Sequence, residues 1–245
     1  MIRDLDIEGS YNVRDLGGYP TADGRTTRPQ VFIRAGNLNE VSPAAQQKLI
    51  DYGVRTVIDL RSPWETERMP NVFAQSDKVK YLNLSLFDLS PKTEQERLAK
   101  TDSSSGLSDL YLKFLNHARP QVTQVMSVLA ESDSTALFHC HAGKDRTGII
   151  AALLLALVGV PEELIVEDYA LTTSRIAHLI PIWREQALAH GVDLERFNRE
   201  MTAEAETMRG MLRHIEAEYG GITEYLLGCG LTQPQLDALK ARFVE

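Results

Sequence analysis

Residues 134–159 join an apolar strand to an apolar helix through a short polar loop, and this arrangement constrains the fold more than any other part of the sequence. STALFHC, residues 134–140, is predicted to be a short buried strand. TGIIAALLLALVG, residues 147–159, is predicted to be a helix that is apolar on every side. Such a helix is stable only where other elements cover it all round. We therefore expect it at the centre of the molecule, beside the strand.

The first half of the chain predicts further strands and helices around this unit. Three segments rich in β-branched and aromatic residues are predicted to be strands: 30–36, 54–60 and 79–86. Three segments are predicted to be helices: 42–53, 107–118 and 120–132. The first of these has Ser42 as its N-cap, Pro43 in its first turn and Gly53 at its end. Residues 100–106, KTDSSSG, are predicted to be a flexible connector.

From Pro161 onward the sequence predicts helices with short breaks: 161–170, 172–189, 194–219, 222–227 and 233–243. Strands early and helices late indicate an α/β fold, with a central mixed sheet flanked by helices and a C-terminal helical cap. No linker rich in Pro, Gly or Ser separates the two parts. We expect one domain over residues 1–245, with a core at about 1–170 and 211–245 and a helical cap or lid at about 171–210.

Charge and cysteine content exclude several classes of protein. The net charge of −8 argues against a nucleic-acid binder and against a polybasic protein of the membrane surface. The longest apolar run, Ile149–Val158, is too short for stable membrane insertion. MIRDLDIEGS does not have the pattern of a secretory signal, and Cys140 and Cys229 do not make a disulfide framework. A cytoplasmic location is expected, with signal-independent export left open.

The loop between the strand and the apolar helix is suited to hold an anion. In HCHAGKDRTG, residues 139–148, it begins at Cys140 and ends at Arg146. The first N–H groups of a helix have no partner within the helix and, with the helix dipole, attract negative charge. Gly143 allows the loop to bend so that successive amides face inward. Arg146 offers a planar fork that matches two phosphate oxygens, and Thr147 is predicted to cap the helix.

The same environment predicts an ionised cysteine. A helix N-terminus and nearby cations lower a cysteine pKa from about 8.5 into roughly the 3.5–7.5 range. We therefore expect the Cys140 sulfur to be a thiolate at neutral pH, at the bottom of a cradle that fits a phosphate. A thiolate in that position is suited to attack phosphorus.

This loop resembles the signature of the cysteine-dependent protein tyrosine phosphatases. Five residues separate Cys140 from Arg146, His139 precedes the cysteine, and Thr147 and Gly148 follow the arginine. The form with a lysine and an aspartate inside the loop resembles the bacterial tyrosine and phosphoinositide phosphatases. YNVRDLGGYPTADGR, RAGNL and GVRTVIDLRSPWE in the first 65 residues resemble the same group, as does EAEYGGITEYLLGCGLTQPQLDALKARF near the end. The resemblance covers nearly the whole chain and implies a tyrosine phosphatase-like fold.

The resemblance also implies a two-step reaction. Cys140 attacks phosphorus and forms a phosphocysteine, which water then hydrolyses. The implied phosphate-binding residues are those of the loop: His141, Ala142, Gly143, Lys144, Asp145 and Arg146. No metal and no cofactor are expected, because the arginine and the amides neutralise the developing charge. The implied substrates are a phosphorylated protein, at tyrosine or also at serine or threonine, or a phosphoinositide, with inorganic phosphate or vanadate as ligands of the site.

A carboxylic acid must protonate the leaving oxygen and later activate water, and two aspartates are candidates. Asp145 inside the loop is the acid that the resemblance implies. Asp88 follows a predicted strand, at a place where other phosphatases of this superfamily carry their acid. Asp59, at the end of another predicted strand, is expected to orient the loop or Arg146 instead.

Several residues near the loop have both a functional and a structural interpretation. Lys144 adds a cation that could meet the extra phosphates of a phosphoinositide. His139 is expected to bond to nearby backbone and to tune the thiolate rather than act as a base, and His141 is expected to line the rim. Arg14 and Asp15 are expected to form a structural ion pair or to border the site.

Other residues also have both a functional and a structural interpretation. Arg34 and Arg61 are expected either near the pocket or apart from it, and Cys229, between two glycines, is expected to be structural. Trp183 belongs to an apolar stripe at helical spacing that also contains Ile176, Leu179 and Ile180. Such a stripe packs against a core, or it closes over the site as a lid.

Other classes of function compete with the enzyme. A catalytically silent module on the same fold would bind phospho-ligands without turnover, and Cys140 alone could be a buried structural thiol. A sulfurtransferase has a similar loop, but the sequence Arg146-Thr147-Gly148 argues against it.

Overall fold

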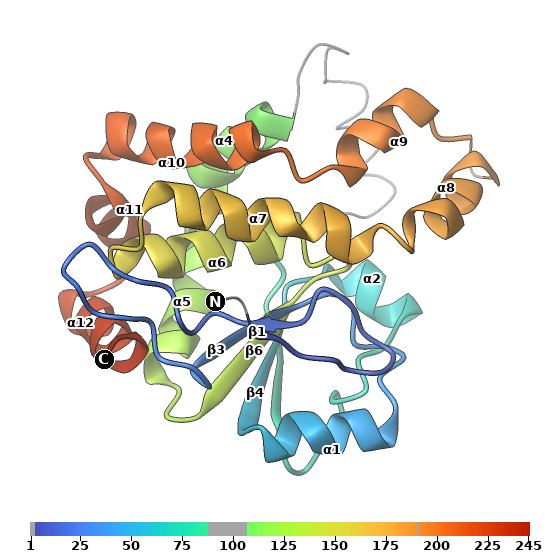
Figure 1. Ribbon diagram of the computed structural model, residues 1–245, viewed down its shortest axis with the longest axis horizontal. Helices are drawn as coiled ribbons and strands as arrows, with labels where there is room; N and C mark the ends of the chain where they lie inside the picture. Colours follow the sequence, from blue (N-terminus) through green and yellow to red (C-terminus); the bar gives the residue numbers. More distant parts are fainter. Residues whose placement is uncertain (1–2, 88–106, 190) are drawn as a thin grey trace.

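A mixed β-sheet lies at the centre of the protein (Figure 1), in a computed structural model that describes residues 3–87, 107–189 and 191–245. The strand order is β1-β2-β3-β6-β4-β5. β3, β6, β4 and β5 run parallel, while β1 and β2 add an antiparallel edge. The strands are β1 Arg3–Asp4, β2 Arg14–Asp15, β3 Phe32–Ala35, β4 Val54–Asp59, β5 Lys80–Asn83 and β6 Thr135–His139.

Helices cover both faces of the sheet (Figure 1). α1 packs against β4 on one face, and α6 packs against β3 and β6 on the other. Further helices form additional layers on this second face: α7 packs on α6, and α10 packs on both α7 and α4. The helices are α1 Pro43–Asp51, α2 Pro63–Arg68, α4 Leu107–His117, α5 Arg119–Glu131, α6 Asp145–Leu157, α7 Glu162–Ile176, α8 Ile180–Ala189, α9 Leu194–Met201, α10 Ala205–Tyr219, α11 Ile222–Cys229 and α12 Gln233–Phe243.

Alternation along the strands divides the apolar side chains between two cores. Ile58 of β4 and Phe138 of β6 belong to the larger core, which includes α6 and the outer helices. Their neighbours Val57 and Leu137 belong to the smaller core beneath α1. A strand directs successive side chains to opposite faces, so this division follows from sequence position alone.

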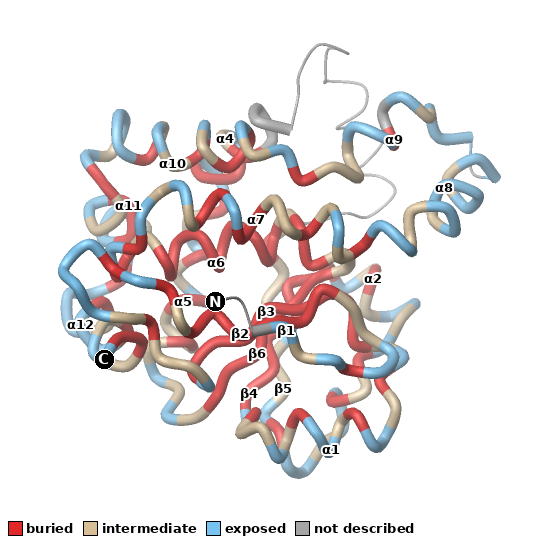
Figure 2. Tube along the Cα trace, viewed as in Figure 1, coloured by how far each residue is buried: buried red, intermediate tan, exposed pale blue. Residues whose placement is uncertain are grey.

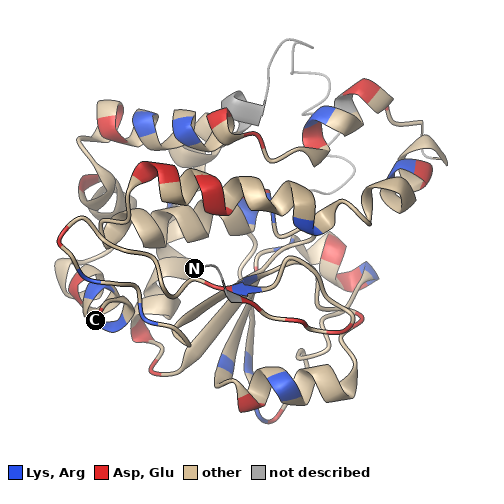
Figure 3. Cartoon of the chain, viewed as in Figure 1, with Lys and Arg blue, Asp and Glu red and all other residues tan. Residues whose placement is uncertain are grey.

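α6 is the most deeply buried helix of the described part of the chain, as the sequence predicts. Every residue from Arg146 to Leu155 is buried, and Figure 2 shows the helix enclosed between the sheet and the outer helices. After Arg146 the helix carries no charged side chain, whereas charged residues are spread along the outer helices (Figure 3). The predicted α/β architecture is confirmed.

Two of the predicted C-terminal helices are each divided in the structure. The prediction of one helix over 172–189 is wrong, because α7 runs through to Ile176 and α8 begins at Ile180. Pro181 lies in the first turn of α8, where its missing N–H costs nothing, while a helix interior would not accept it. The predicted helix over 194–219 is divided at Ala203, whose N–H donates to Thr173 Oγ1 (2.9 Å) instead of to the preceding helical turn.

α8 and α9 are the least enclosed part of the described C-terminal region. α8 has no buried residue, and in Figure 2 both helices lie at one end of the molecule with mostly exposed surface. Phe197 of α9 is buried. The predicted division between a core and a cap at about 171–210 stays a prediction. None of the helices in the described residues combines the length and the apolar character that crossing a membrane requires.

Candidate active site

The signature loop begins where the parallel strands end. His139 is the last residue of β6 and lies in register with Ala35 of β3 and Asp59 of β4. The chain then bends through Cys140 to Lys144, which is the N-cap of α6. Ligand sites of open α/β sheets occur at this end of the strands, where the loops vary in sequence while the sheet fixes the positions at which they start.

Donors from the N-terminal segment hold the carbonyl oxygens of the loop from outside. Tyr11 Oη and the backbone N–H of Asn37 both donate to His141 O, each at 2.9 Å. Asn12 Nδ2 donates to Ala142 O (3.1 Å) and to Gly143 O (3.0 Å). Because a peptide unit is planar, a carbonyl fixed outward turns the next N–H inward.

Arg34 completes this outer ring of donors. Its Nη2 donates to Gly143 O at 2.8 Å, and its Nη1 forms an ion pair with the carboxylate of Asp168 in α7. Arg14 binds the same carboxylate through Nε (2.8 Å), and all three side chains are buried. Burial alone would raise the pKa of Asp168, but the two guanidinium groups hold it well below its usual range. One carboxylate between two arginines leaves a net positive charge behind the loop.

Gly143 is required by both conformation and space. Its φ of +68° lies in the left-handed region, which side chains disfavour. A Cβ atom at this position would lie 2.6 Å from the carbonyl oxygen of Ala35. Only glycine lets the loop pass this close to the end of β3.

The N-terminus of α6 directs unpaired amides toward the loop. The first hydrogen bond at this end runs from Gly148 N–H to Lys144 O (2.8 Å). The N–H groups of residues 145–147 have no carbonyl one turn earlier, and the helix dipole adds partial positive charge beside them. Cys140, which is 3% exposed, is enclosed by the loop that these amides border.

Arg146 is held by a bidentate ion pair with Glu65. Nη1 lies 2.6 Å from Oε2 and Nη2 lies 2.9 Å from Oε1, and both side chains are almost fully buried. Burial alone would lower the pKa of Arg146, but the negative charge of Cys140 and the bonds to Glu65 raise it, so the guanidinium stays charged. Burial would raise the pKa of Glu65, and the bonds and charge of Arg146 reverse that shift.

Glu65 is placed by the start of α2. The N–H and the hydroxyl of Ser62, the N-cap, both donate to Oε2, at 2.8 and 3.0 Å. These bonds belong to a capping box at the N-terminus of α2. They fix the Glu65 carboxylate in the orientation in which it binds the guanidinium of Arg146.

His139 supports the backbone of Cys140 from below. Asn71 Oδ1 accepts from Phe73 N–H (2.8 Å), so its Nδ2 faces His139 Nε2 (2.8 Å) as a donor. Nδ1 lies 3.1 Å from Cys140 O, and because a carbonyl oxygen only accepts, Nδ1–H is the donor of this bond. The expected contact of His139 with nearby backbone is confirmed.

Asp145 receives two donors on one oxygen. Lys144 Nζ lies 2.7 Å and Tyr111 Oη 2.9 Å from its Oδ1, and the Asp145 side chain is 32% exposed. Lys144 itself is buried and also lies 3.5 Å from the carbonyl oxygen of Thr202. Burial would lower the pKa of Lys144, but the charge of Asp145 raises it.

A family model described as the tyrosine phosphatase family matches residues 5–245, which include this loop and all the elements that hold it. The chain belongs to the tyrosine phosphatase family.

The similarity between this phosphatase and its relatives covers most of its length. It is 34% identical to a tyrosine-protein phosphatase of Nostoc commune over 223 residues, which are 86% of this chain and 73% of that protein. It is 26% identical over 278 aligned positions to PtpB of Mycobacterium tuberculosis, a triple specificity protein phosphatase, covering 96% and 97% of the two chains. The crystal structure of P. aeruginosa TpbA aligns with 94% of this chain and 96% of its own, at 16% identity and a TM-score of 0.44.

Asp59 of the phosphatase does not contact Arg146. Asp59 was expected to orient the loop or Arg146, and Arg146 is not among its partners: its carboxylate accepts from Arg61 Nη2 (2.6 Å) and from Tyr81 Oη (3.0 Å). A role in orienting the loop stays a prediction. The link of Asp59 to the loop is indirect, since Oδ2 lies 3.4 Å from His139 Nε2. Arg61 therefore belongs to the layer beneath the loop.

Two further expectations are corrected by the helix boundary and by the ion pairs. Thr147 is not the cap of α6, because the helix already begins at Asp145, and its buried hydroxyl has no hydrogen-bond partner among the described residues. Arg14 does not pair with Asp15, because successive residues of strand β2 face opposite sides. Asp15 instead accepts from Tyr52 Oη at 2.7 Å.

An aromatic wall of the phosphatase joins the loop to α8. The ring of Trp183 lies 5.4 Å from the His141 ring and 5.7 Å from the Tyr11 ring. The expected place of His141 at the rim fits its partial burial, which lowers its pKa so that the imidazole is neutral. Asp88, the other candidate acid, lies outside the described residues, as does the predicted connector at 100–106.

Several residues of the site were missed by sequence reasoning. They all lie outside the signature in the chain: Tyr11, Asn12, Glu65, Tyr111 and Asp168. Glu65 had a local signal, because Ser62 followed three residues later by glutamate is a helix-capping pattern. The others have no such signal, since only the fold brings them to the loop.

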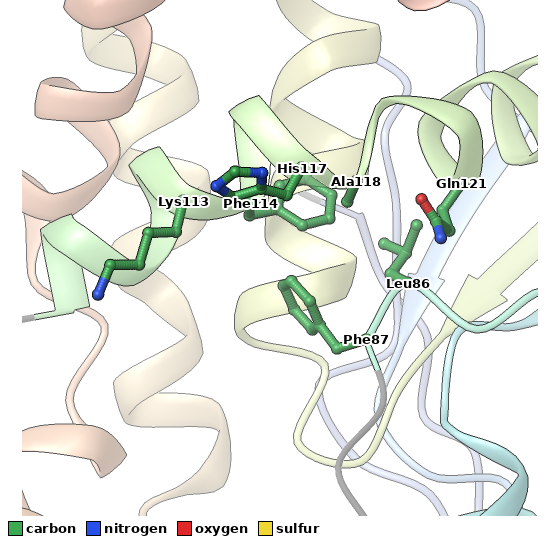
Figure 4. A pocket seen from close by; sticks show the side chains of 7 residues that line it. All are labelled: Leu86, Phe87, Lys113, Phe114, His117, Ala118 and Gln121. Atoms are coloured by element: carbon green, nitrogen blue, oxygen red, sulfur yellow. The ribbon is translucent and has the colours of Figure 1, made fainter. Parts of the chain in front are cut away.

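A cavity of about 250 Å³ lies apart from the signature loop. Figure 4 shows it between the end of β5 and helices α4 and α5, and it is lined by Leu86, Phe87, Lys113, Phe114, His117, Ala118 and Gln121. None of the signature residues borders it. In the described residues, no group of three or more His, Cys, Asp or Glu side chains is placed to hold a metal ion.

Proposed function

We propose that the protein is a phosphomonoester hydrolase that works through a phosphocysteine at Cys140. The observation that supports this most is the loop in which donors from residues 11–37 hold the carbonyl oxygens outward around this cysteine. An anion in such a cradle meets amides that are already oriented, so little reorganisation is needed during reaction.

In the first step the Cys140 thiolate attacks phosphorus. The S–P bond forms, the ester P–O bond breaks, and the electron pair of that bond passes to the leaving oxygen. Asp145 gives its proton to that oxygen. In the second step water attacks phosphorus and gives a proton back to Asp145, while the S–P bond breaks and its electrons return to sulfur.

Arg146 is suited to hold the transferring group in both steps. A guanidinium has five N–H donors, and Glu65 takes one from each terminal nitrogen. Nε–H and the second hydrogen of Nη2, which share one edge of the planar fork, are left for two phosphoryl oxygens. With the amides of the loop, they neutralise the charge that builds up on those oxygens.

We propose phosphotyrosine as the preferred substrate. The aromatic wall of Tyr11, His141 and Trp183 gives a phenyl ring surfaces to pack against when its phosphate enters the loop. Phosphoserine, phosphothreonine and phosphoinositides are secondary candidates, supported by the resemblance to a triple specificity phosphatase. Lys144 is bound to Asp145 and buried, so it is poorly placed to meet a second phosphate.

The reaction is tested with p-nitrophenyl phosphate and two cysteine variants. Cys140→Ser is expected to lose turnover by a factor of about 10⁴ or more, because the nucleophile is removed. Cys229→Ser, at the partly buried second cysteine, is the matched control and should keep full activity. Vanadate should inhibit the wild type, and rapid denaturation in alkali, where an S–P bond survives, should trap a phosphate on Cys140. Turnover that persists undiminished in Cys140→Ser contradicts the proposal.

The same assay separates the enzyme from a catalytically silent binding module. A module would bind phosphate with no turnover in the wild type. A panel of a phosphotyrosine peptide, a phosphoserine peptide and phosphoinositide vesicles then ranks substrates by kcat/KM. We expect the phosphotyrosine peptide to rank first, and a higher value for either other class would overturn the proposed preference.

A further inference from the structure

The two oxygens of Asp145 have different surroundings. Oδ1 accepts from Lys144 Nζ (2.7 Å) and from Tyr111 Oη (2.9 Å). Among the described residues no hydrogen bond or ion pair reaches Oδ2. Because the side chain is 32% exposed while both of its partners are buried, Oδ2 is the oxygen left open toward the space outside α6.

The direction of the hydrogen bonds follows from the chemistry of the groups. An ionised carboxylate accepts only, so Tyr111 donates its single hydroxyl hydrogen to Oδ1. Tyr169 Oη, 2.9 Å from Tyr111 Oη, must then donate to Tyr111. The chain of donors runs from Tyr169 of α7 through Tyr111 of α4 to Asp145.

Both phenols keep their hydrogens at neutral pH. Burial raises the pKa of Tyr111 well above its ordinary value and the pKa of Tyr169 to about 12. The two rings also pack edge to face, with centroids 6.1 Å apart, so the hydroxyl of Tyr111 has little freedom to turn away.

We propose that Tyr111 is a positioning residue for the acid–base step: its hydroxyl fixes Oδ1 of Asp145 so that Oδ2 carries the transferable proton. The inference rests on the proposed function, in which Asp145 is the acid. The bond from Tyr111 suits both forms of the group, since Oδ1 accepts whether Oδ2 is protonated or bare. The carboxyl therefore keeps one orientation when it protonates the leaving oxygen and when it takes a proton from water.

Tyr111 has a task that Lys144 does not perform. Lys144 is the neighbour of Asp145 in sequence, and its ammonium is a point charge with three equivalent donors, so it fixes the orientation of the carboxyl less than a phenol does. Tyr111 reaches Asp145 from α4, a separate element, and its ring is held by packing. A donor from a second rigid element is what restricts the rotation of the carboxyl group.

The test compares two aryl esters in the full-length protein. Phenol is a poorer leaving group than p-nitrophenol and needs the acid more. Tyr111→Phe should lower kcat with phenyl phosphate about tenfold, the effect of losing one hydrogen bond to a charged group, and lower kcat with p-nitrophenyl phosphate much less. KM should stay within about twofold for both esters, because the substrate cradle is untouched.

Tyr225→Phe is the matched control. Tyr225 is buried to the same degree, and its hydroxyl donates to Leu115 O (3.2 Å) of α4, the helix that carries Tyr111, but away from the loop. Tyr225→Phe should lose the stability that a buried hydroxyl contributes. Its kcat with each of the two esters should equal that of the wild type. If Tyr111→Phe behaves like Tyr225→Phe, Tyr111 is only structural and the inference is overturned.

Asp145→Asn separates this inference from the proposed function. It should lower kcat with phenyl phosphate roughly 100-fold or more and should make the rate depend steeply on the leaving group. If Asp145→Asn shows no such dependence, the proposed acid is wrong whatever Tyr111 does. If Asp145→Asn shows it and Tyr111→Phe does not, only the role of Tyr111 fails.

A second variant covers the case in which Tyr111→Phe does not fold. Tyr169→Phe removes the hydroxyl that orients Tyr111 but leaves the bond to Asp145. It should lower kcat with phenyl phosphate about two- to threefold, as for one neutral hydrogen bond, with a smaller effect on p-nitrophenyl phosphate. Unchanged rates with both esters, or only the small change that Tyr225→Phe shows, would overturn the inference.

Discussion

Arg146 shows how a single residue of the site depends on its partner. A guanidinium that serves a phosphoryl group must be buried beside the sulfur, yet burial without a counter-charge is costly. Glu65 resolves this by neutralising the arginine from the side, through Nη1 and Nη2. The remaining donors keep their direction because the fork is planar.

Glu65→Gln should therefore weaken both stability and activity. The variant keeps one acceptor but loses the charge, so the free energy of unfolding should fall by roughly 1–3 kcal/mol. Misdirection of Arg146 should lower kcat/KM about tenfold or more. Urea unfolding and steady-state kinetics measure the two effects. Ser62→Ala, which removes only one donor to Glu65, is the matched control and should lose little activity.

The stability difference between the wild type and Glu65→Gln should depend on pH in one direction. The pKa of Glu65 is lowered in the folded protein, so its contribution to stability is fully present above the unfolded value of about 4.3. It is lost as the pH falls from there through the lower pKa of the folded state. The gap in unfolding free energy between wild type and Glu65→Gln should be constant near neutrality and shrink below about pH 4. A gap that widens in acid would contradict the ion pair.

At the scale of elements, the sheet and the buried helix are the parts that sequence patterns predict well. β3, β4, β5 and β6 lie within the predicted segments. β3, β4 and β6 are rich in apolar residues, as buried strands are, and the segment that contains β5 alternates between apolar and polar residues. β1, β2 and α2 were not predicted, since two-residue strands and a six-residue helix leave no periodic signal. Two predicted helices were too long: the one over 172–189 is interrupted before Pro181, and the one over 194–219 is interrupted at Ala203.

α8 gives an element-scale prediction, because it touches the loop through Trp183. Trp183→Ala should raise KM for a phosphotyrosine peptide roughly two- to tenfold, the worth of one aromatic contact, with little change in kcat. KM for a phosphoserine peptide should change less. Trp64→Ala is the matched control, because Trp64 lies on α2 and stacks with Arg68 at the surface.

Fluorescence tests the same contact independently. Trp64 and Trp183 are the two tryptophans of the chain, so Trp64→Phe leaves Trp183 as the single reporter. Its emission should change when vanadate binds, and Trp183→Phe should abolish that response. Unchanged emission in Trp64→Phe would argue that α8 does not respond to the loop, and with it against a lid.

At the scale of the whole molecule, one buried carboxylate joins the N-terminal strands, the outer helices and the loop. Asp168 of α7 binds Arg14 of β2 and Arg34 of β3, and Arg34 also holds Gly143 O. No periodicity reveals such a contact, because its members are about 130 to 150 residues apart. The sequence therefore predicts the signature loop but not the residues that keep it in shape.

Asp168→Asn should destabilise the protein strongly. It leaves two arginines buried without their counter-charge, which costs about 3–5 kcal/mol. Chemical denaturation with two independent probes measures the loss. Asp23→Asn, which breaks an exposed pair with Arg25, is the matched control and should have no measurable effect. Equal midpoints for the two variants would show that the buried pair does not support the fold.

The outward anchoring of Gly143 O has a consequence for how the protein is made. Its two donors stand 109 and 131 positions earlier in the chain, and the carboxylate that steadies one of them is translated after the loop itself. Distant pairings close slowly, behind local helices. A nascent chain emerging from the ribosome thus contains the signature loop before Asp168 has been made. We expect the loop to reach its final shape after the local helices when the protein refolds.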